Sequence, residues 1–174
     1  MAMTEQLDVG AEADDFAIVY SRLHRDVFRY CLVLTRSVEE AEDVASETFE
    51  RGLRAWRSGR AAAGAPLPWL LLVARRIVID RGRRRELLRW IPLGAAHEHH
   101  VTPAPESDRI EFWLWFDRLS SALTSRQREV LLLRYQCDLT DAEIGRILGL
   151  SEPGVRSLAS RAVSALRNHP ELLR

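Results

Sequence analysis

The stretch TDAEIGRILGLSEPGVRSLASRAVSAL, residues 140–166, decides the fold of the C-terminal part of the chain. Thr140 with Glu143 three residues later, and then Ser151, mark two helix starts, because their side-chain oxygens accept hydrogen bonds from free amides of a first helical turn. Gly149 lies between the two segments, where a left-handed backbone is easiest for glycine. The stretch therefore predicts two helices joined by a tight turn.

The spacing within this stretch predicts how the two helices pack. Gly145, four residues before Gly149, is small enough for the second helix to cross the first closely. Val155, six residues after Gly149, is β-branched and suits packing of the second helix back on the first. The remaining core positions are Ile144, Leu148, Leu150, Leu158 and Ala162. This grammar is typical of a helix-turn-helix; the alternative is two antiparallel helices of an ordinary bundle.

The second of these helices presents polar side chains outward, and such a helix can enter the major groove of DNA. Its outward positions are Glu152, Gly154, Arg156, Ser157, Ser160, Arg161 and Ser164. Arg156 and Arg161 could alternatively be solvated surface. Sequence alone does not separate base readout from phosphate contact.

Upstream of the motif, two further helices are predicted, over residues 107–122 and from Thr124, with Gln127 as its capping partner, to about Tyr135. Residues 91–106 contain three prolines and no helical stripe, which indicates a flexible linker. The cluster at 97–100 holds three histidines. Because its ligands lack helical i, i+4 spacing, mobile polar sequence is favoured over a metal site.

The N-terminal part also has helical periodicity. After a polar tail at 1–13, apolar residues recur every three or four positions from Phe16 to Leu34. Ser37 and Glu40 form a reciprocal capping box, in which each side chain satisfies the free amide of the other residue. The helix that follows runs to Trp56. A loop at 57–66 precedes a third helix, from Pro68 towards Trp90. No segment alternates at period two. The chain is predicted to be all-α, with helical domains at 14–90 and 107–174 whose relative placement the linker leaves free.

Charge is divided unevenly along a chain whose net charge is zero. Residues 1–56 carry −6, residues 57–90 carry +7 and residues 91–174 carry −1. An acidic block beside a basic block predicts two different partners. The acidic helix face consists of Glu42, Asp43, Glu47 and Glu50. It would repel DNA, so it is either a protein-docking face or solvated surface. The arginines of 75–89 could bind nucleic acid or form a soluble face, and Trp69 could stack on a base or belong to the core.

Length and composition exclude several classes of protein. At 174 residues, 47% hydrophobic and 29% charged, the chain is neither disordered nor a membrane protein. It shows no export signal, so a cytoplasmic location is expected. Cys31 is predicted to be a core residue, and Cys137, at a helix end, a redox switch only as a remote alternative. Phosphate-binding glycine loops, nucleophile elbows and paired metal motifs are absent from the sequence, so no catalytic site, cofactor or metal is expected.

Three segments together resemble bacterial RNA polymerase sigma factors of the extracytoplasmic-function (ECF) type, within the sigma-70 family. EAEDVASETFERGLRAW, residues 40–56, is similar to the second conserved region. PWLLLVARRIVIDRGRRR, residues 68–85, resembles the promoter-melting helix. Residues 122–167 resemble the C-terminal helix-turn-helix domain. The resemblance covers about four-fifths of the chain, in the order and spacing of the family.

The resemblance implies roles for particular residues. Binding to core polymerase, through the clamp helices of the β′ subunit, would fall to Glu42, Asp43, Glu47 and Glu50. The −10 element would be bound by Arg57, Arg60, Trp69, Arg75, Arg76, Asp80, Arg81 and Arg84, with the loop after Arg57 capturing a flipped base. The −35 element would be bound by Ser151, Glu152, Gly154, Arg156, Ser157, Ser160 and Arg161. The C-terminal domain would meet the β flap, the linker would thread towards the polymerase active centre, and an anti-sigma factor is a reasonable further partner.

The sequence also departs from the pattern of the family. Gly154 stands where threonine is usual, Leu158 where a basic residue is usual, and Arg76 where asparagine is common. These departures bear on the detailed promoter contacts. The competing function is a stand-alone helix-turn-helix repressor or activator, which predicts a palindromic operator bound without polymerase but does not explain the acidic helix.

Overall fold

The computed structural model describes the backbone at 3–59, 66–88, 112, 114–116, 118 and 122–169, with side chains from 16 onward except 87 and 88. These residues contain helices and no strand, as predicted. The N-terminal helices are α1 (Met3–Thr35), α2 (Val38–Arg57) and α3 (Pro66–Leu88). The C-terminal helices are α5 (Ser125–Leu131), the π-helical turn η1 (Leu132–Gln136), α6 (Asp141–Leu148) and α7 (Glu152–Arg167). The predicted linker at 91–106 and the histidine cluster lie outside the described residues.

Helix starts follow the capping signals of the sequence, with one correction. The pairs Thr124–Gln127 and Thr140–Glu143 each form a complete reciprocal box. Ser37 caps α2 by accepting from the Glu40 amide at 3.3 Å. The Glu40 carboxylate, however, accepts from Arg85 Nη2 at 2.7 Å instead of returning to the cap. The reciprocal half of this box was therefore wrong, because an arginine on α3 offers the carboxylate a charged donor.

Two helix boundaries differ from the sequence-based expectation. Helix α1 begins at Met3, inside the segment predicted as a polar tail. That segment has no proline, and it contains three alanines, two glutamates and two methionines, which favour helix. Helix α3 begins at Pro66, two residues before the expected Pro68. Both prolines fit a first helical turn, where the missing N–H costs no hydrogen bond.

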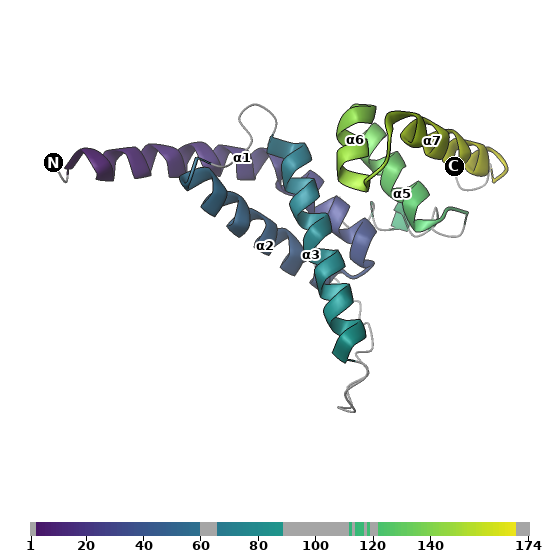
Figure 1. The fold of residues 1–174 in the computed structure, drawn as a ribbon, viewed down its shortest axis with the longest axis horizontal. Helices are drawn as coiled ribbons and strands as arrows, with labels where there is room; N and C mark the ends of the chain where they lie inside the picture. Colours follow the sequence, from purple (N-terminus) through teal and green to yellow (C-terminus); the bar gives the residue numbers. More distant parts are fainter. Residues whose placement is uncertain are drawn as a thin grey trace.

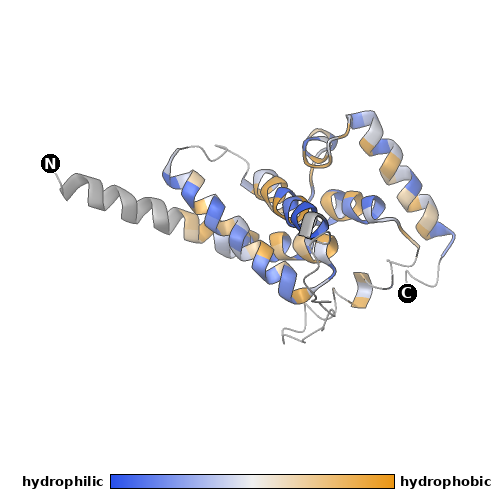
Figure 2. Ribbon diagram, turned by 60° about the horizontal axis from the view of Figure 1, so that its bottom comes forward, coloured by the Kyte–Doolittle hydropathy of each residue, from blue (hydrophilic) through white to orange (hydrophobic). Residues whose placement is uncertain are grey.

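The three N-terminal helices pack around a shared apolar core (Figure 1). The apolar stripe of α2 was expected to line its inner face with Ala41, Val44, Ala45, Thr48, Phe49 and Trp56; all are buried except Trp56, which is partly buried and packs against the core. Cys31 of α1 is 0% exposed, so its predicted core role is confirmed. In the ribbon of Figure 2, coloured by residue hydropathy, hydrophobic and hydrophilic residues alternate along each described helix, as expected for helices with one packed side. No helix in the described ranges is long and apolar enough to span a bilayer.

The helix-turn-helix forms as its spacing predicts. Gly149 adopts the left-handed conformation, with φ 68° and ψ 41°, and its N–H bonds to the Gly145 carbonyl. A Cβ built on Gly145 would lie 2.5 Å from the backbone oxygen of Leu150. The close approach at Gly145 is therefore to the turn leading into α7. Val155 is 0% exposed, and its Cγ2 lies 3.9 Å from the position of a Cβ on Gly145.

The two helical domains contact each other. Helices α1 and α3 pack against α5 and α6, and Figure 1 shows α6 beside α3. Arg75 of α3 and Glu129 of α5 form an ion pair across this contact, with Nε and Oε2 3.3 Å apart. The structure thus differs from the expectation of freely placed domains, because charged and apolar groups of both are buried in a common interface.

Candidate nucleic-acid and polymerase interfaces

The acidic face of α2 lies on the side of the helix away from the N-terminal core. Asp43 and Glu50 are exposed, whereas Glu42 and Glu47 are half-buried. The opposite side of the same helix is apolar and packed, so these carboxylates are held at fixed positions along one rigid element. The face predicted for protein docking is therefore accessible mainly through Asp43 and Glu50.

Glu47 has a second role that the sequence did not reveal. Its Oε1 accepts from Arg51 at 2.6 Å and its Oε2 accepts from Arg81 at 2.7 Å. Burial raises the pKa of Glu47, but the hydrogen bonds from Arg81 and Arg51 outweigh it and leave that pKa below its ordinary value. Glu47 therefore ties the acidic helix α2 to the basic helix α3 as well as contributing to the acidic face.

Some charged side chains of the basic helix α3 are exposed to solvent, and others form ion pairs with neighbouring helices. Arg76, Asp80 and Arg84 are exposed. Because they follow one another at intervals of four, they lie along one face of the helix. Arg81, with 34% of its side chain exposed, is engaged by Glu47. The exposed row is the part of the predicted −10 surface that is free to meet a nucleic acid.

Two other predicted −10 residues, Arg75 and Trp69, are less accessible. Arg75 is 18% exposed and paired with Glu129. Burial raises the pKa of Glu129, against the lowering effect of the neighbouring Arg75. Trp69 is partly buried and packs against the core, close to Trp56. Arg57 is exposed at the end of α2, and Arg60 lies outside the described residues.

Helix α7 presents the outward surface that its sequence predicts. Exposed positions are Ser151, Glu152, Arg156, Ser157, Ser160 and Arg161, while Gly154 is half-buried. Ser151 caps the helix by accepting from the Gly154 amide at 3.3 Å. A Cβ on Gly154 would lie 3.3 Å from that same Ser151 oxygen, so the cap is tightly fitted around the glycine. The N-terminal turn of α7 is thus exposed and ordered by its cap.

Asp141 is a residue of this surface that sequence reasoning missed. Its Oδ1 accepts from Arg134 and its Oδ2 accepts from Arg156 Nη1 at 3.5 Å. Arg156 Nη1 also lies 3.8 Å from Glu152 Oε2. The outward arginine of α7 is therefore held between two carboxylates. The available signal was the position of Asp141 directly after the Thr140 cap, at the start of a helix that packs against α7.

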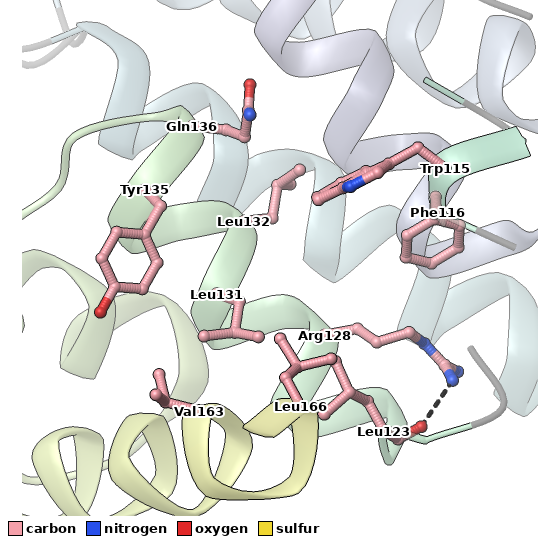
Figure 3. Close-up of a pocket in the computed structure, with 10 residues that line it drawn as sticks. All are labelled: Trp115, Phe116, Leu123, Arg128, Leu131, Leu132, Tyr135, Gln136, Val163 and Leu166. Carbon is pink, nitrogen blue, oxygen red and sulfur yellow. Dashed lines mark hydrogen bonds between the residues drawn. The ribbon is translucent and has the colours of Figure 1, made fainter. Parts of the chain in front are cut away.

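A second missed feature is an apolar groove on the C-terminal domain, with a volume of about 180 Å³. Figure 3 shows Tyr135 and Leu131 on one side, Val163 and Leu166 of α7 below, and Trp115 and Phe116 opposite. Tyr135 is 64% and Trp115 36% exposed, so the groove presents two aromatic side chains to solvent. Arg128 lies at the edge and donates to the Leu123 carbonyl at 2.8 Å.

Metal-binding clusters are absent from the described residues, as judged by groups of three or more histidine, cysteine or acidic side chains. Burial raises the pKa of both thiols, Cys31 and Cys137, to about 12. The chemistry that these surfaces offer is charge complementarity and apolar contact.

Family profiles match both helical domains. A profile described as Sigma-70 region 2 matches residues 19–87, and one described as Sigma-70, region 4 matches residues 121–168. Together these matches cover more than half of the chain, and they fall on α1–α3 and on α5–α7. The chain belongs to the sigma-70 family of RNA polymerase sigma factors.

Individual relatives show which group of sigma-70 family proteins the chain resembles. The chain is 32% identical over 165 residues to the ECF RNA polymerase sigma factor SigL of Mycobacterium tuberculosis, covering 90% of this chain and 89% of SigL. It is 26% identical over 174 residues to SigX of Bacillus subtilis, covering 92% and 86%. It is 29% identical over 169 residues to BldN of Streptomyces coelicolor and spans 64% of that longer protein. The protein is an ECF sigma factor, which binds core RNA polymerase and directs promoter recognition.

Solved structures share the fold. The sigma factor RpoE of Bartonella quintana, in complex with the anti-sigma factor NepR, aligns with a TM-score of 0.66 at 19% identity, covering 91% of this chain and 96% of RpoE. CnrH in complex with the cytosolic domain of CnrY aligns with a TM-score of 0.62 at 18% identity, covering 94% and 92%.

Proposed function

We propose that this sigma factor uses the acidic face of α2 for core polymerase, the exposed row of α3 for the −10 element and the N-terminal turn of α7 for the −35 element. The single observation that carries the proposal is the separation of these surfaces: acidic side chains lie on one helix of the N-terminal domain and exposed arginines on another. Carboxylates disfavour a DNA backbone, whereas arginines neutralise its phosphates. One domain can therefore meet protein and nucleic acid at once.

The exposed row of α3 suits the opening of a promoter. Flipping a base out of a duplex costs about a few kcal/mol. Arg76 and Arg84 offer phosphate contacts to the displaced strand, which offset part of this cost. Trp69 packs against the core, so in this proposal it supports the helix and is a base-stacking platform only through its exposed edge. Asp80 lies between the two arginines and would repel phosphate, which favours a base or an amine there.

At the −35 element, Arg156 would reach the major groove from the first turns of α7. Asp141 and Glu152 hold it in position before DNA arrives. Gly154 leaves the cap of α7 without a side chain at the position where the family usually has threonine, so phosphate contact there would come from Ser151 and Ser157.

The apolar groove at Tyr135 and Trp115 supports docking of the C-terminal domain on the polymerase β flap. An exposed apolar groove of this kind accepts an amphipathic helix or an extended hydrophobic segment. The same groove is available to an anti-sigma factor, the kind of partner that RpoE of Bartonella quintana binds in the structure above. Competition between the two would provide regulation by sequestration.

Sigma factors are specificity subunits of RNA polymerase. We propose that this one contributes no catalytic group, cofactor or metal, and that it works in the cytoplasm with the polymerase. A stand-alone operator-binding protein is the alternative, but it leaves the match to Sigma-70 region 2 and the acidic helix without a role.

Reconstituted transcription tests the proposal. Core polymerase lacking any sigma subunit is combined with a genomic promoter library, with and without this protein, and transcript starts are mapped. Starts that depend on the protein and share −35 and −10 motifs are expected. Absence of such starts, together with tight binding of the protein alone to a palindromic DNA, would instead establish the operator-binding alternative.

A further inference from the structure

The two helical domains meet at a largely buried ion pair, and one member of the pair is an arginine of the basic helix α3. Arg75 of α3 and Glu129 of α5 are 18% and 9% exposed, with Nε and Oε2 3.3 Å apart. Tyr30 of α1, 0% exposed, lies near enough for both charges to act on its hydroxyl. Arg75 belongs to the N-terminal domain and Glu129 to the C-terminal domain, so the pair is a contact between domains.

A second point of contact lies between α1 and the end of η1. Arg29 Nη1 donates to Gln136 Oε1 at 3.3 Å. The next residue, Cys137, is 8% exposed, and the charges of Asp26 and Arg29 on α1 act on its thiol. Cys137 is therefore covered where α1 meets the C-terminal domain, so its accessibility reports whether the two domains are together.

We propose that the Arg75–Glu129 pair is an intramolecular latch: its matched charges permit the closed arrangement of the free chain, which withholds Arg75 from nucleic acid, and a mismatch of the two charges opens it. The inference rests on the proposed function of α3. In the closed chain Arg75 Nε–H faces the Glu129 carboxylate and only 18% of the Arg75 side chain is exposed, so little of the guanidinium is accessible to a phosphate. Arg76 and Arg84 remain exposed on the same helix, so closure removes one member of the basic surface while leaving the others.

The latch is suited to release. Burying two charges costs desolvation energy that their mutual attraction only partly returns. Opening the domains returns both charges to water together, so it costs little in net electrostatic terms. Removing or reversing one partner is different, because the closed state then holds an uncompensated buried charge. Reversal of one charge should open the chain, and reversal of both should close it again.

Reaction of Cys137 with a disulfide reagent tests the latch in the full chain. The chain holds two cysteines, so a Cys31→Ala background leaves Cys137 as its one thiol. In that background the reaction should be slow. Glu129→Arg and Arg75→Glu should each accelerate it by about tenfold or more, because loss of one partner of a buried pair is strongly destabilising. The double variant should return to within about twofold of the starting rate.

Matched variants separate opening from other effects. Glu39→Arg makes the same charge change on the exposed side of α2 and should leave the rate unchanged. Circular dichroism on every variant reports helix content, and small-angle scattering reports the radius of gyration, which should rise in the single variants only. If one single variant loses helix, the other single variant and the double variant still decide the outcome.

Unchanged Cys137 reactivity in a helical single variant would overturn the latch, as would a double variant that stays reactive. Either result leaves the proposed function standing, since that is judged by transcript starts. Loss of protein-dependent starts in the wild-type chain, with the thiol results as expected, would instead overturn the proposed function alone.

Discussion

Gly145 illustrates how a single position sets the geometry of the helix-turn-helix. A Cβ there would lie 2.5 Å from the Leu150 backbone oxygen, and backbone cannot move aside as a flexible side chain can. Gly145→Ala should therefore lower stability by about 1–3 kcal/mol, the range for overpacking. Gly82, in α3, has no atom within 4 Å of its built Cβ. Gly82→Ala should raise stability by about 0.5–1 kcal/mol.

Urea unfolding of both variants measures these differences. The opposite signs are the important part of the prediction. A Gly145→Ala variant as stable as wild type would show that the turn after α6 can relax, and that the small residue is not required by packing.

Glu143 makes one helix start sensitive to pH. Hydrogen bonds from the Thr140 hydroxyl and amide lower the pKa of Glu143 below its ordinary value. The folded state therefore holds this proton less tightly than the unfolded state. The stabilisation is present at neutral pH and is lost as the pH falls below the ordinary glutamate value and through the lowered one. Unfolding free energies at pH 7 and in acid should differ less in Glu143→Gln than in wild type, whereas an equal difference in both proteins would contradict this prediction.

At the scale of the element, α2 depends on its N-terminal cap. Ser37 is buried and supplies the side-chain acceptor for the Glu40 amide, while Glu40 itself is engaged by Arg85. Ser37→Ala should cost about 1 kcal/mol, as is typical for loss of a cap. Ser46→Ala, at an exposed interior position of the same helix, should be neutral or stabilising by a few tenths of a kcal/mol. Thermal or urea unfolding of the two variants measures the contrast, and equal effects would show that the cap contributes nothing specific.

The elements also show where sequence reasoning reached its limit. Capping residues and apolar periodicity act within four residues along the chain, so α2, α6 and α7 were predictable with their starts. The π-helical turn at Leu132–Gln136 was not, since it ends where the chain packs against α1 and leaves no local signal. The groove at Tyr135 likewise needs α7 and the helical segment at Trp115 to form its walls.

For the whole molecule, the separation of the acidic and basic surfaces predicts separable defects. Arg76→Ala combined with Arg84→Ala should reduce promoter-dependent initiation by roughly tenfold or more, because each arginine that neutralises a phosphate contributes to the electrostatic affinity for DNA. Its affinity for core polymerase should be nearly unchanged. Asp43→Arg combined with Glu50→Arg should weaken binding to core polymerase and thereby abolish initiation. Arg22→Ala, an exposed arginine of α1, serves as the control.

Transcription from a mapped promoter and binding to fluorescent core polymerase measure the two properties independently. Equal loss of both properties in both double variants would contradict the assignment of separate surfaces.

The sequence by itself determined the all-helical class, the two domains, the helix-turn-helix and the positions of the acidic and basic helices, because caps, turns and periodicity are local in the chain. Tertiary structure alone decided which charges are free. Glu47 and Arg81 engage each other across α2 and α3, Arg75 is covered by Glu129 of the other domain, and Trp69 packs against the core. These outcomes depend on distances between residues remote in sequence, where burial and pairing determine whether a charge faces solvent.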